Sequence, residues 1–129
     1  MRISLKFDTI YSAMPLRGIR GAITVPANAK EEIITATQEL LQVMLAENGV
    51  RVEEIASAIF SVTKDLNAEF PAAAAREIGW KDTPLLCTYE IDVPGSLQKC
   101  IRALLHVNTE KKQADMRHVY LRDAKSLRR

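Results

Sequence analysis

The sequence predicts a single mixed α/β (α+β) domain with a five-stranded sheet and helices on one side of it. Three observations predict this fold class. The chain has 129 residues, which is enough for one hydrophobic core and too few for two domains. Segments that alternate like strands and segments with helical spacing follow one another in the order β, α, β, α, β, β, β. No internal repeat or low-complexity tract interrupts this order.

The first strand and the first helix have the clearest signals. Alternation predicts the strand over 16–25. Asn28 and Glu31 have the spacing of a capping box and open a long helix, which Asn48-Gly49 ends. The apolar stripe of this helix has helical spacing and comprises Ile33, Thr37, Leu40, Leu41, Met44 and Leu45.

The rest of the chain predicts shorter elements. A helical turn is expected over 52–54 and a second strand over 57–63, and Pro71 starts a helix that runs to residue 78 and that Gly79 ends. Three more strands are predicted, over 84–93, 100–108 and 117–122, with a helical turn over 96–99 and a polar loop over 109–115. Residues 1–13 match none of these patterns, so we expect a flexible or loosely docked extension before a single domain over 14–129.

Composition excludes several classes of function. The chain has 18 basic and 16 acidic residues and only 5% aromatic residues, without the basic excess and aromatic platforms typical of nucleic-acid binding. It has no apolar run long enough for a membrane span and no signal-peptide core, so we expect a cytoplasmic protein. Cys87 and Cys100 are too few for a disulfide framework and are expected to be reduced.

The familiar catalytic motifs are missing from the sequence. It contains no G-x-S-x-G elbow, no complete dinucleotide fingerprint and no phosphate loop. His106 and His118 lack metal-ligand spacing, so no zinc site is expected, and each histidine fits a hydrogen-bonded packing role. Cys87 fits a small buried apolar residue better than a nucleophile, which would need a base and an electropositive pocket.

Arginines at strand positions are the best candidates for binding chemistry. Alternation over 16–25 places Arg20 on one face with Gly18 and Ala22, which leaves room for a ligand to approach the backbone. A guanidinium fork above such a floor suits a carboxylate or phosphate, because its planar donors can bind the anion bidentately. The alternative is an edge strand with solvated arginines.

Arg102 and Tyr120 extend this set of polar candidates. Arg102 lies in the middle of an apolar strand, where burial is costly unless an anion pairs with it. The alternative is an internal salt bridge to Glu90 or Asp92. Tyr120 presents its hydroxyl from the less apolar face of the last strand, and its alternative role is an amphipathic aromatic at a surface edge.

Four strings occur together and in order. They are Arg17-Gly18-Ile19-Arg20-Gly21-Ala22, Phe70-Pro71-Ala72, Cys100-Ile101-Arg102 and Arg117-His118-Val119-Tyr120-Leu121. In this combination the chain resembles, over about 15–128, the small monofunctional chorismate mutases of the AroH class. The resemblance implies a homotrimer of pseudo-barrel subunits with active sites between neighbours. It also implies the rearrangement of chorismate to prephenate in aromatic amino-acid biosynthesis, without cofactor or metal.

The resemblance further implies roles for individual residues. Arg102 would face the ether oxygen where negative charge grows, and Arg20 and Tyr120 would bind a substrate carboxylate. Glu90 would accept the ring hydroxyl and favour positive charge on the ring. The other implied substrate-binding residues are Leu86 and Cys87 through their backbones, Phe70, Ala72 and Arg76 from the adjacent subunit, and Leu127 and Arg128 over the entrance. Two features depart from the family pattern: Ala73 replaces a frequent lysine, and much of the usual C-terminal tail is missing.

Two other functions fit the same arginines. One is an imine or enamine deaminase of the Rid type, a trimeric family of similar architecture that holds a carboxylate with an arginine. This chain carries the paired arginines around Gly18 and the 117–120 string, which that family lacks. The other is a non-catalytic carboxylate-binding module on the same trimeric fold, because binding and catalysis would use the same side chains.

Overall fold

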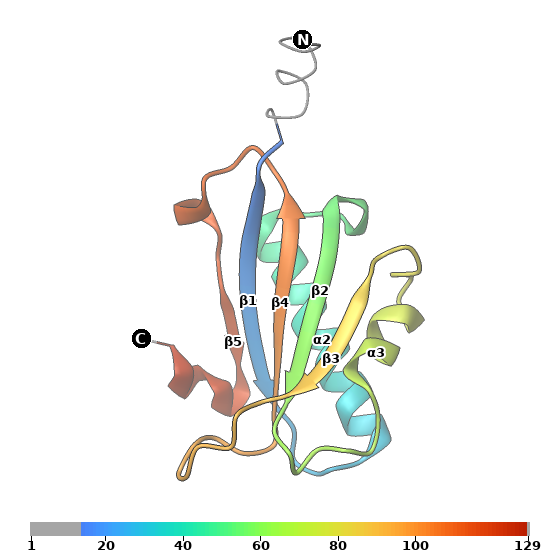
Figure 1. The fold of residues 1–129 in the computed structure, drawn as a ribbon, viewed down its shortest axis with the longest axis vertical. Helices are drawn as coiled ribbons and strands as arrows, with labels where there is room; N and C mark the ends of the chain where they lie inside the picture. Colours follow the sequence, from blue (N-terminus) through green and yellow to red (C-terminus); the bar gives the residue numbers. More distant parts are fainter. Residues whose placement is uncertain (1–13, 129) are drawn as a thin grey trace, which may run out of the picture.

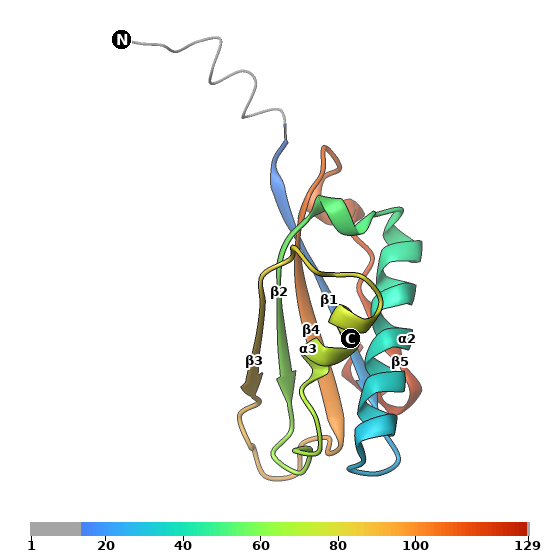
Figure 2. The ribbon, with the colours of Figure 1, turned by 90° about the vertical axis from the view of Figure 1, so that its right-hand side faces the viewer.

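The computed structural model describes residues 14–128, in which five strands form one sheet with two helices packed on one face (Figures 1 and 2). The strand order across the sheet is β3-β2-β4-β1-β5. The strands are β1 (Leu16–Thr24), β2 (Ile55–Val62), β3 (Leu85–Tyr89), β4 (Cys100–Asn108) and β5 (Val119–Leu121), and the helices are α2 (Lys30–Asn48) and α3 (Pro71–Glu77). Short 3₁₀ segments lie at η1 (Val52–Glu54), η2 (Gln113–Asp115) and η3 (Arg122–Leu127). The predicted fold class is therefore confirmed, and the expected extension over 1–13 lies outside the described residues.

Strand pairing places the polar candidates in one row across the sheet. The central strand β4 runs antiparallel to both β1 and β2, and Arg102 pairs with Ala22 on one side and with Ser61 on the other. The short strand β5 runs parallel to β1 and pairs Tyr120 with Ala22. Because directly paired residues share a face of the sheet, Tyr120, Arg102 and Ser61 all project from the same side.

The opposite face of the sheet carries the core. Helix α2 buries the predicted stripe against it, except that Leu45 is only partly buried, and α3 packs beside α2 (Figure 2). Gly21 faces this helix: a Cβ atom there would overlap Sδ of Met44 and lie 3.0 Å from Cδ1 of Leu40. Glycine at position 21 therefore lets α2 pack closely against the sheet. This packing stabilises the core face, which lies opposite the face that carries the Arg20 side chain. No helix among residues 14–128 has both the length and the apolar character needed to cross a lipid bilayer.

The start of α2 differs from the prediction. Its N-cap residue is Ala29, and no side chain caps the helix. The Asn28 side chain instead accepts hydrogen bonds from the backbone N–H groups of Asn67 and Ala68, both at 3.0 Å, and donates one to the Asn67 side chain. The predicted capping box is therefore wrong, because Asn28 finds three partners in the loop before α3.

Three predictions near the ends of strands are also wrong. Strand β3 ends at Tyr89 rather than at residue 93, because its partner strand β2 ends at Val62 opposite Tyr89. The segment 96–99 forms no helical turn. The last strand covers only 119–121, because Arg122 takes a φ of 55° and starts η3, which the sequence did not predict.

Segment η3 folds over one end of the face that carries Arg102. Its Ala124 is buried against Ala22 and Cys100, and Tyr120 and Leu127 pack around this small cluster. Two hydrogen bonds anchor the start of η3 to Thr24, one from the Arg122 guanidinium to the backbone carbonyl and one from the Asp123 N–H to the hydroxyl. The remainder of this face is not covered by either helix (Figure 2).

The outer edge of β1 is completed by side chains where β5 does not reach. The Gln113 amide bonds both polar backbone groups of Gly18, with Oε1 at 2.8 Å from the nitrogen and Nε2 at 2.7 Å from the oxygen. Two residues further on, the backbone N–H of Arg20 donates to Nδ1 of His118 at 2.9 Å. The ladder to β5 then begins at Gly21.

Candidate active site

A cleft of about 240 Å³ lies over the row of polar residues on the uncovered face of the sheet. Arg20, Glu90, Arg102 and Tyr120 all line it. Its floor is formed by small residues of the central strands and its walls by apolar side chains, namely Gly21, Ala22, Ala103, Ile59, Leu104 and Leu127. Four separate elements or loops thus bring the four polar candidates to one place.

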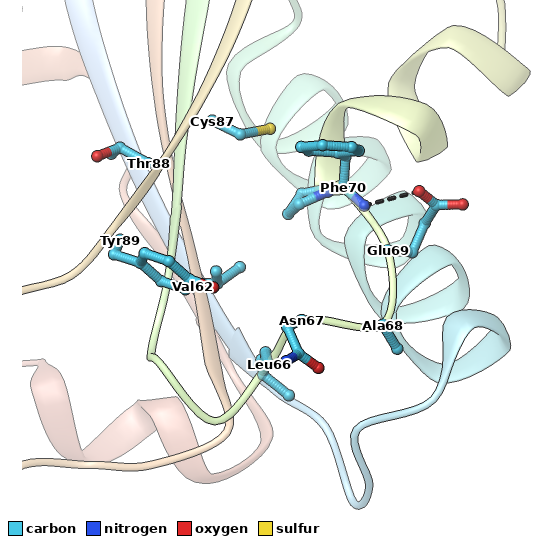
Figure 3. A pocket seen from close by; sticks show the side chains of 10 residues that line it. Val62, Leu66, Asn67, Ala68, Glu69, Phe70, Cys87, Thr88 and Tyr89 are labelled. Atoms are coloured by element: carbon cyan, nitrogen blue, oxygen red, sulfur yellow. Dashed lines mark hydrogen bonds between the residues drawn. The ribbon is translucent and has the colours of Figure 1, made fainter.

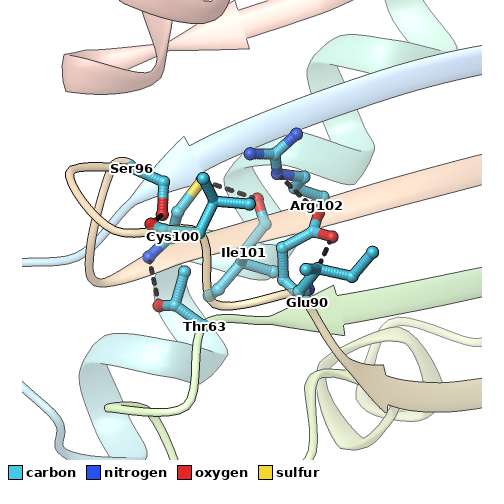
Figure 4. Close-up of polar contacts among 8 residues, drawn as sticks. Thr63, Glu90, Ser96, Cys100, Ile101 and Arg102 are labelled. Carbon is cyan, nitrogen blue, oxygen red and sulfur yellow. Dashed lines mark hydrogen bonds and ion pairs between the residues drawn. The ribbon is translucent and has the colours of Figure 1, made fainter.

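Arg102 and Glu90 form the central ion pair of this cleft (Figure 4). The Nε atom of Arg102 lies 3.0 Å from Oε2 of Glu90, and the two side chains are 38% and 30% exposed. Although this nitrogen is buried, its N–H is too poorly aligned to make a hydrogen bond within the described part of the chain. Because Glu90 contacts Arg102 at Nε and the side chain is still 38% exposed, the outer guanidinium nitrogens can meet a ligand while Glu90 balances the charge.

The internal salt bridge that the sequence offered as an alternative is thus present, and its partner is Glu90. Asp92, the other acidic candidate, pairs instead with Lys64 at 2.8 Å on the surface. The pair to Glu90 does not remove Arg102 from the cleft, because more than a third of its side chain stays accessible. The salt bridge and a ligand-binding role are compatible.

The cleft widens toward the C-terminus into a larger hollow of about 1200 Å³. Arg20, Arg102, Tyr120 and Leu127 line both parts, so the two are continuous. The wider part adds three basic or titratable side chains, Arg117, His118 and Arg128, and one acidic side chain, Glu47. Positive groups outnumber negative ones, which favours an anionic ligand.

The two histidines take the packing roles that the sequence favoured. His118 accepts the hydrogen bond from the Arg20 backbone described above. Partial burial and the nearby positive charge of Arg20 lower the pKa of His118 below its ordinary value. His106 lies on the uncovered face with Nδ1 at 3.0 Å from Oγ of Ser57. No group of three or more histidine, cysteine, aspartate or glutamate side chains within 14–128 is arranged to hold a metal ion.

A second cleft of about 350 Å³ lies between β3 and the loop that leads into α3 (Figure 3). Phe70 and Cys87 line it. Burial raises the pKa of the Cys87 thiol, against the opposing effects of a hydrogen bond from the Ala72 backbone and of the Arg76 charge. The thiol is thus kept protonated at neutral pH, which does not suit a nucleophile.

The predicted site residues fall into two groups in one chain. Arg20, Glu90, Arg102, Tyr120 and Leu127 meet in the first cleft, and Arg128 lies in its wider part. Phe70 and Cys87 lie in the second cleft, with the buried Ala72 and the exposed Arg76 in the helix beside it. Leu86 is 62% exposed and points away from Cys87, as alternation requires. No residue lines both the second cleft and either part of the first.

Sequence reasoning missed several residues of the first cleft. Ser61 and Ile59 of β2 lie beside Arg102 and Leu104 of β4. Alternation assigns each of these side chains to a face of its own strand, but it does not say which residues of two strands lie opposite each other. The register between β2 and β4 supplies that information.

The fold and this cleft define a class: a small mixed α/β domain with a cleft on its open sheet face whose basic lining suits an anionic ligand. The sequence profile of chorismate mutase type I matches residues 16–129. The chain belongs to this family. It is 54% identical over 114 residues to chorismate mutase AroH of Thermus thermophilus, an alignment that covers 88% of this chain and 93% of the relative.

Two further comparisons agree. Chorismate mutase AroH of Bacillus subtilis is 45% identical over 116 residues, covering 89% of this chain and 91% of the relative. A solved structure of a chorismate mutase from Clostridium thermocellum superposes with a TM-score of 0.83 at 56% identity, covering 84% of this chain and 97% of that one. The resemblance found in the sequence is thus confirmed. The protein is an enzyme, an isomerase that rearranges chorismate to prephenate in aromatic amino-acid biosynthesis, and the comparisons favour neither the deaminase nor the non-catalytic module.

Proposed function

We propose that Arg20, Glu90, Arg102 and Tyr120 carry out this rearrangement, in a site that a neighbouring subunit of a homotrimer completes. The observation that carries the proposal is their arrangement around one cleft, with Arg102 beside Glu90 at its centre. The substrate is a flexible dianion, and both fixed guanidinium groups are suited to hold it.

The chemistry requires few kinds of side chain. One ether C–O bond breaks while one C–C bond forms within the same molecule, so no proton moves and no covalent enzyme intermediate is needed. The enzyme must hold the substrate in its compact chair-like conformer and stabilise the charge that separates as the ether breaks. A rate gain of ~10⁶ corresponds to about 8 kcal/mol of barrier reduction. Preorganisation plus one or two charge-assisted hydrogen bonds can supply that amount.

Each of the four residues has a part in this reaction. Arg102 donates to the ether oxygen, where negative charge grows, and the position of its partly exposed guanidinium in the cleft supports this assignment. Arg20 and the Tyr120 hydroxyl bind a substrate carboxylate. Glu90 accepts the ring hydroxyl and favours the positive charge that develops on the ring, while it also orients Arg102.

The separation of the two clefts supports a site shared between subunits. Phe70 and Cys87 line a cleft that has no residue in common with the arginine cleft, which favours a substrate that contacts the two sets on different copies. Large exposed apolar side chains on and after β3 supply a surface for such an assembly. They are Leu86, Tyr89, Ile91 and Val93, each more than half exposed. Leu127 and Arg128 would then cover the entrance.

Mixed assembly tests the shared site directly. Arg102→Ala disables one half, and Phe70→Asp places a carboxylate in the other half at a position that is 66% exposed in the single chain, so the fold of the chain itself should tolerate it. Each variant alone should be nearly inactive against chorismate. Refolding the two together at equal amounts should restore about a quarter of the activity per site, because random mixing leaves about one interface in four intact.

The control is each variant refolded alone, together with sedimentation of the mixture. A trimeric mixture that stays inactive would contradict the shared site, and an active monomer would contradict the trimer itself.

A further inference from the structure

We propose that His118 is a positioning residue that holds Arg20 in its substrate-binding orientation by accepting the Arg20 backbone N–H. The inference rests on the role of Arg20 proposed above and adds to it a residue that acts through the Arg20 backbone. It is supported by a hydrogen bond of 2.9 Å at the point where the ladder between β1 and β5 stops.

The hydrogen bond from Arg20 to His118 lies at a position of β1 that β5 does not pair. Strand β5 pairs with β1 only from Gly21 to Ile23, so β5 itself offers Arg20 no partner residue. The His118 ring takes that place and extends the ladder by one position, as Gln113 does at Gly18. Backbone that is paired on both edges moves less than backbone paired on one, so the ring limits the directions in which the Arg20 side chain can leave the strand.

His118 also lies close in the sequence to Tyr120, the other residue proposed to bind the substrate carboxylate. His118 directly precedes β5, and Tyr120 lies two residues further on. Arg20 and Tyr120 line the same cleft. Loss of the bond would therefore loosen both groups relative to each other, while Arg102 on β4 would stay in place.

The bond requires a neutral imidazole. Nδ1 can accept a hydrogen bond only when it carries no proton, so the ring proton must be on Nε2. Burial and the charge of Arg20 lower the pKa of His118, which keeps the ring neutral and the bond intact at neutral pH. Below that pKa both Nδ1 and the Arg20 nitrogen carry a proton, and the bond breaks.

The other charged groups around His118 do not reverse this effect. Arg20 on β1, Arg117 before β5 and Arg128 after η3 are positive, and Glu47 on α2 is negative and lies 3.7 Å from Arg117. A protonated His118 would add positive charge to the cleft and attract the substrate. That attraction is screened by solvent in so open a cleft. Loss of the Nδ1 acceptor, by contrast, directly removes the hydrogen bond that holds the Arg20 backbone.

The first test separates KM from kcat. Because Arg20 binds a carboxylate away from the breaking bond, His118→Ala should raise KM for chorismate about tenfold and change kcat little. His118→Asn should restore most of the affinity, because the amide oxygen can take the position of Nδ1. His106→Asn is the matched control and should keep the KM of the parent. A merely structural role for His118 would lower the amount of folded enzyme, and with it kcat, without this change in KM.

The second test is the pH profile of KM. In the parent enzyme KM should rise as the pH falls through the pKa of His118, and in His118→Asn this rise should disappear because an amide does not titrate. An acid limb that persists in His118→Asn, or that disappears in His106→Asn, would overturn the inference. This comparison uses a conservative variant and stays decisive if His118→Ala does not fold.

A double-mutant cycle separates this inference from the proposed role of Arg20. If His118 acts through Arg20, then His118→Ala should have almost no further effect on KM in an Arg20→Ala background. Full additivity of the two changes would overturn the inference and leave the role of Arg20 intact. An unchanged KM in Arg20→Ala alone would overturn the role of Arg20 itself.

Discussion

Arg102 and Glu90 lie 3.0 Å apart at the centre of the cleft, from Nε to Oε2, yet the N–H of Arg102 does not complete a hydrogen bond to the carboxylate. Glu90 follows the last residue of β3, and Arg102 lies on the central strand β4. Because Glu90 holds Arg102 at Nε, the outer nitrogens of the guanidinium can meet negative charge that appears only in the transition state.

Arg102→Ala should lower kcat for chorismate by at least ~10², because it removes a donor aimed at developing negative charge. The loss of chorismate absorbance measures this turnover in purified protein. Arg17→Ala is the matched control and should leave turnover unchanged, since the Arg17 guanidinium donates to the backbone carbonyl of Lys111 and lines neither cleft. An Arg102→Ala enzyme with parental turnover would show that the ether oxygen is stabilised by another group.

Glu90→Gln should lower kcat by about tenfold or more, because the substitution keeps the shape of the side chain and removes its charge. Two effects act in the same direction: Arg102 loses its counterion, and positive charge on the ring loses its stabilising partner. Circular dichroism should show a fold equal to that of the parent. If turnover were unaffected, the carboxylate charge would have no part in the reaction.

Turnover at saturating chorismate should be nearly constant between neutral and mildly alkaline pH. No side chain exchanges a proton in the reaction, and the lowered pKa of His118 places its titration on the acid side of neutrality. A pH series of kcat on the parent enzyme checks this expectation. A bell-shaped profile centred near pH 7 would reveal an acid or a base among the catalytic groups.

Gly21→Ala should destabilise the fold by about 1 kcal/mol, because the new methyl group would overlap Sδ of Met44 and force that flexible side chain to shift. Gly18→Ala is the control: its Cβ would come no closer than 3.7 Å to Leu104, which is ordinary contact. Urea unfolding monitored by circular dichroism measures both differences. Equal midpoints for the two variants would mean that α2 moves away from the sheet at little cost.

Much of the fold could be predicted from periodicity. The stripe of α2 and the alternation of β1 and β4 are strong signals, because burial against one face imposes them directly. The ends of β3 and β5 could not be predicted, because they depend on where the partner strand stops. The positive φ of Arg122 is set by bonds from its guanidinium to Thr24 and to Glu39 on α2, which no local pattern encodes.

The sequence indicated individual residues of the candidate site, but it did not show how they lie relative to one another. Alternation correctly assigned Arg20 and Arg102 to faces of their own strands, but it left two acidic partners open for Arg102, and the structure selects Glu90 over Asp92. Only the register shows that Tyr120 and Arg102 both lie opposite Ala22. The use of His118 to complete the edge of β1 required the structure, because its partner is a backbone group 98 residues away in the sequence.

The side chains that complete the edge of β1 also bear on how these molecules avoid misassembly. Gln113 engages the backbone of Gly18, His118 engages Arg20, and β5 pairs with the next three residues. An extended segment from a stray chain therefore finds this edge already occupied and has little template for strand addition. Two polar side chains and a three-residue strand thus protect a nine-residue strand from fibrillar association.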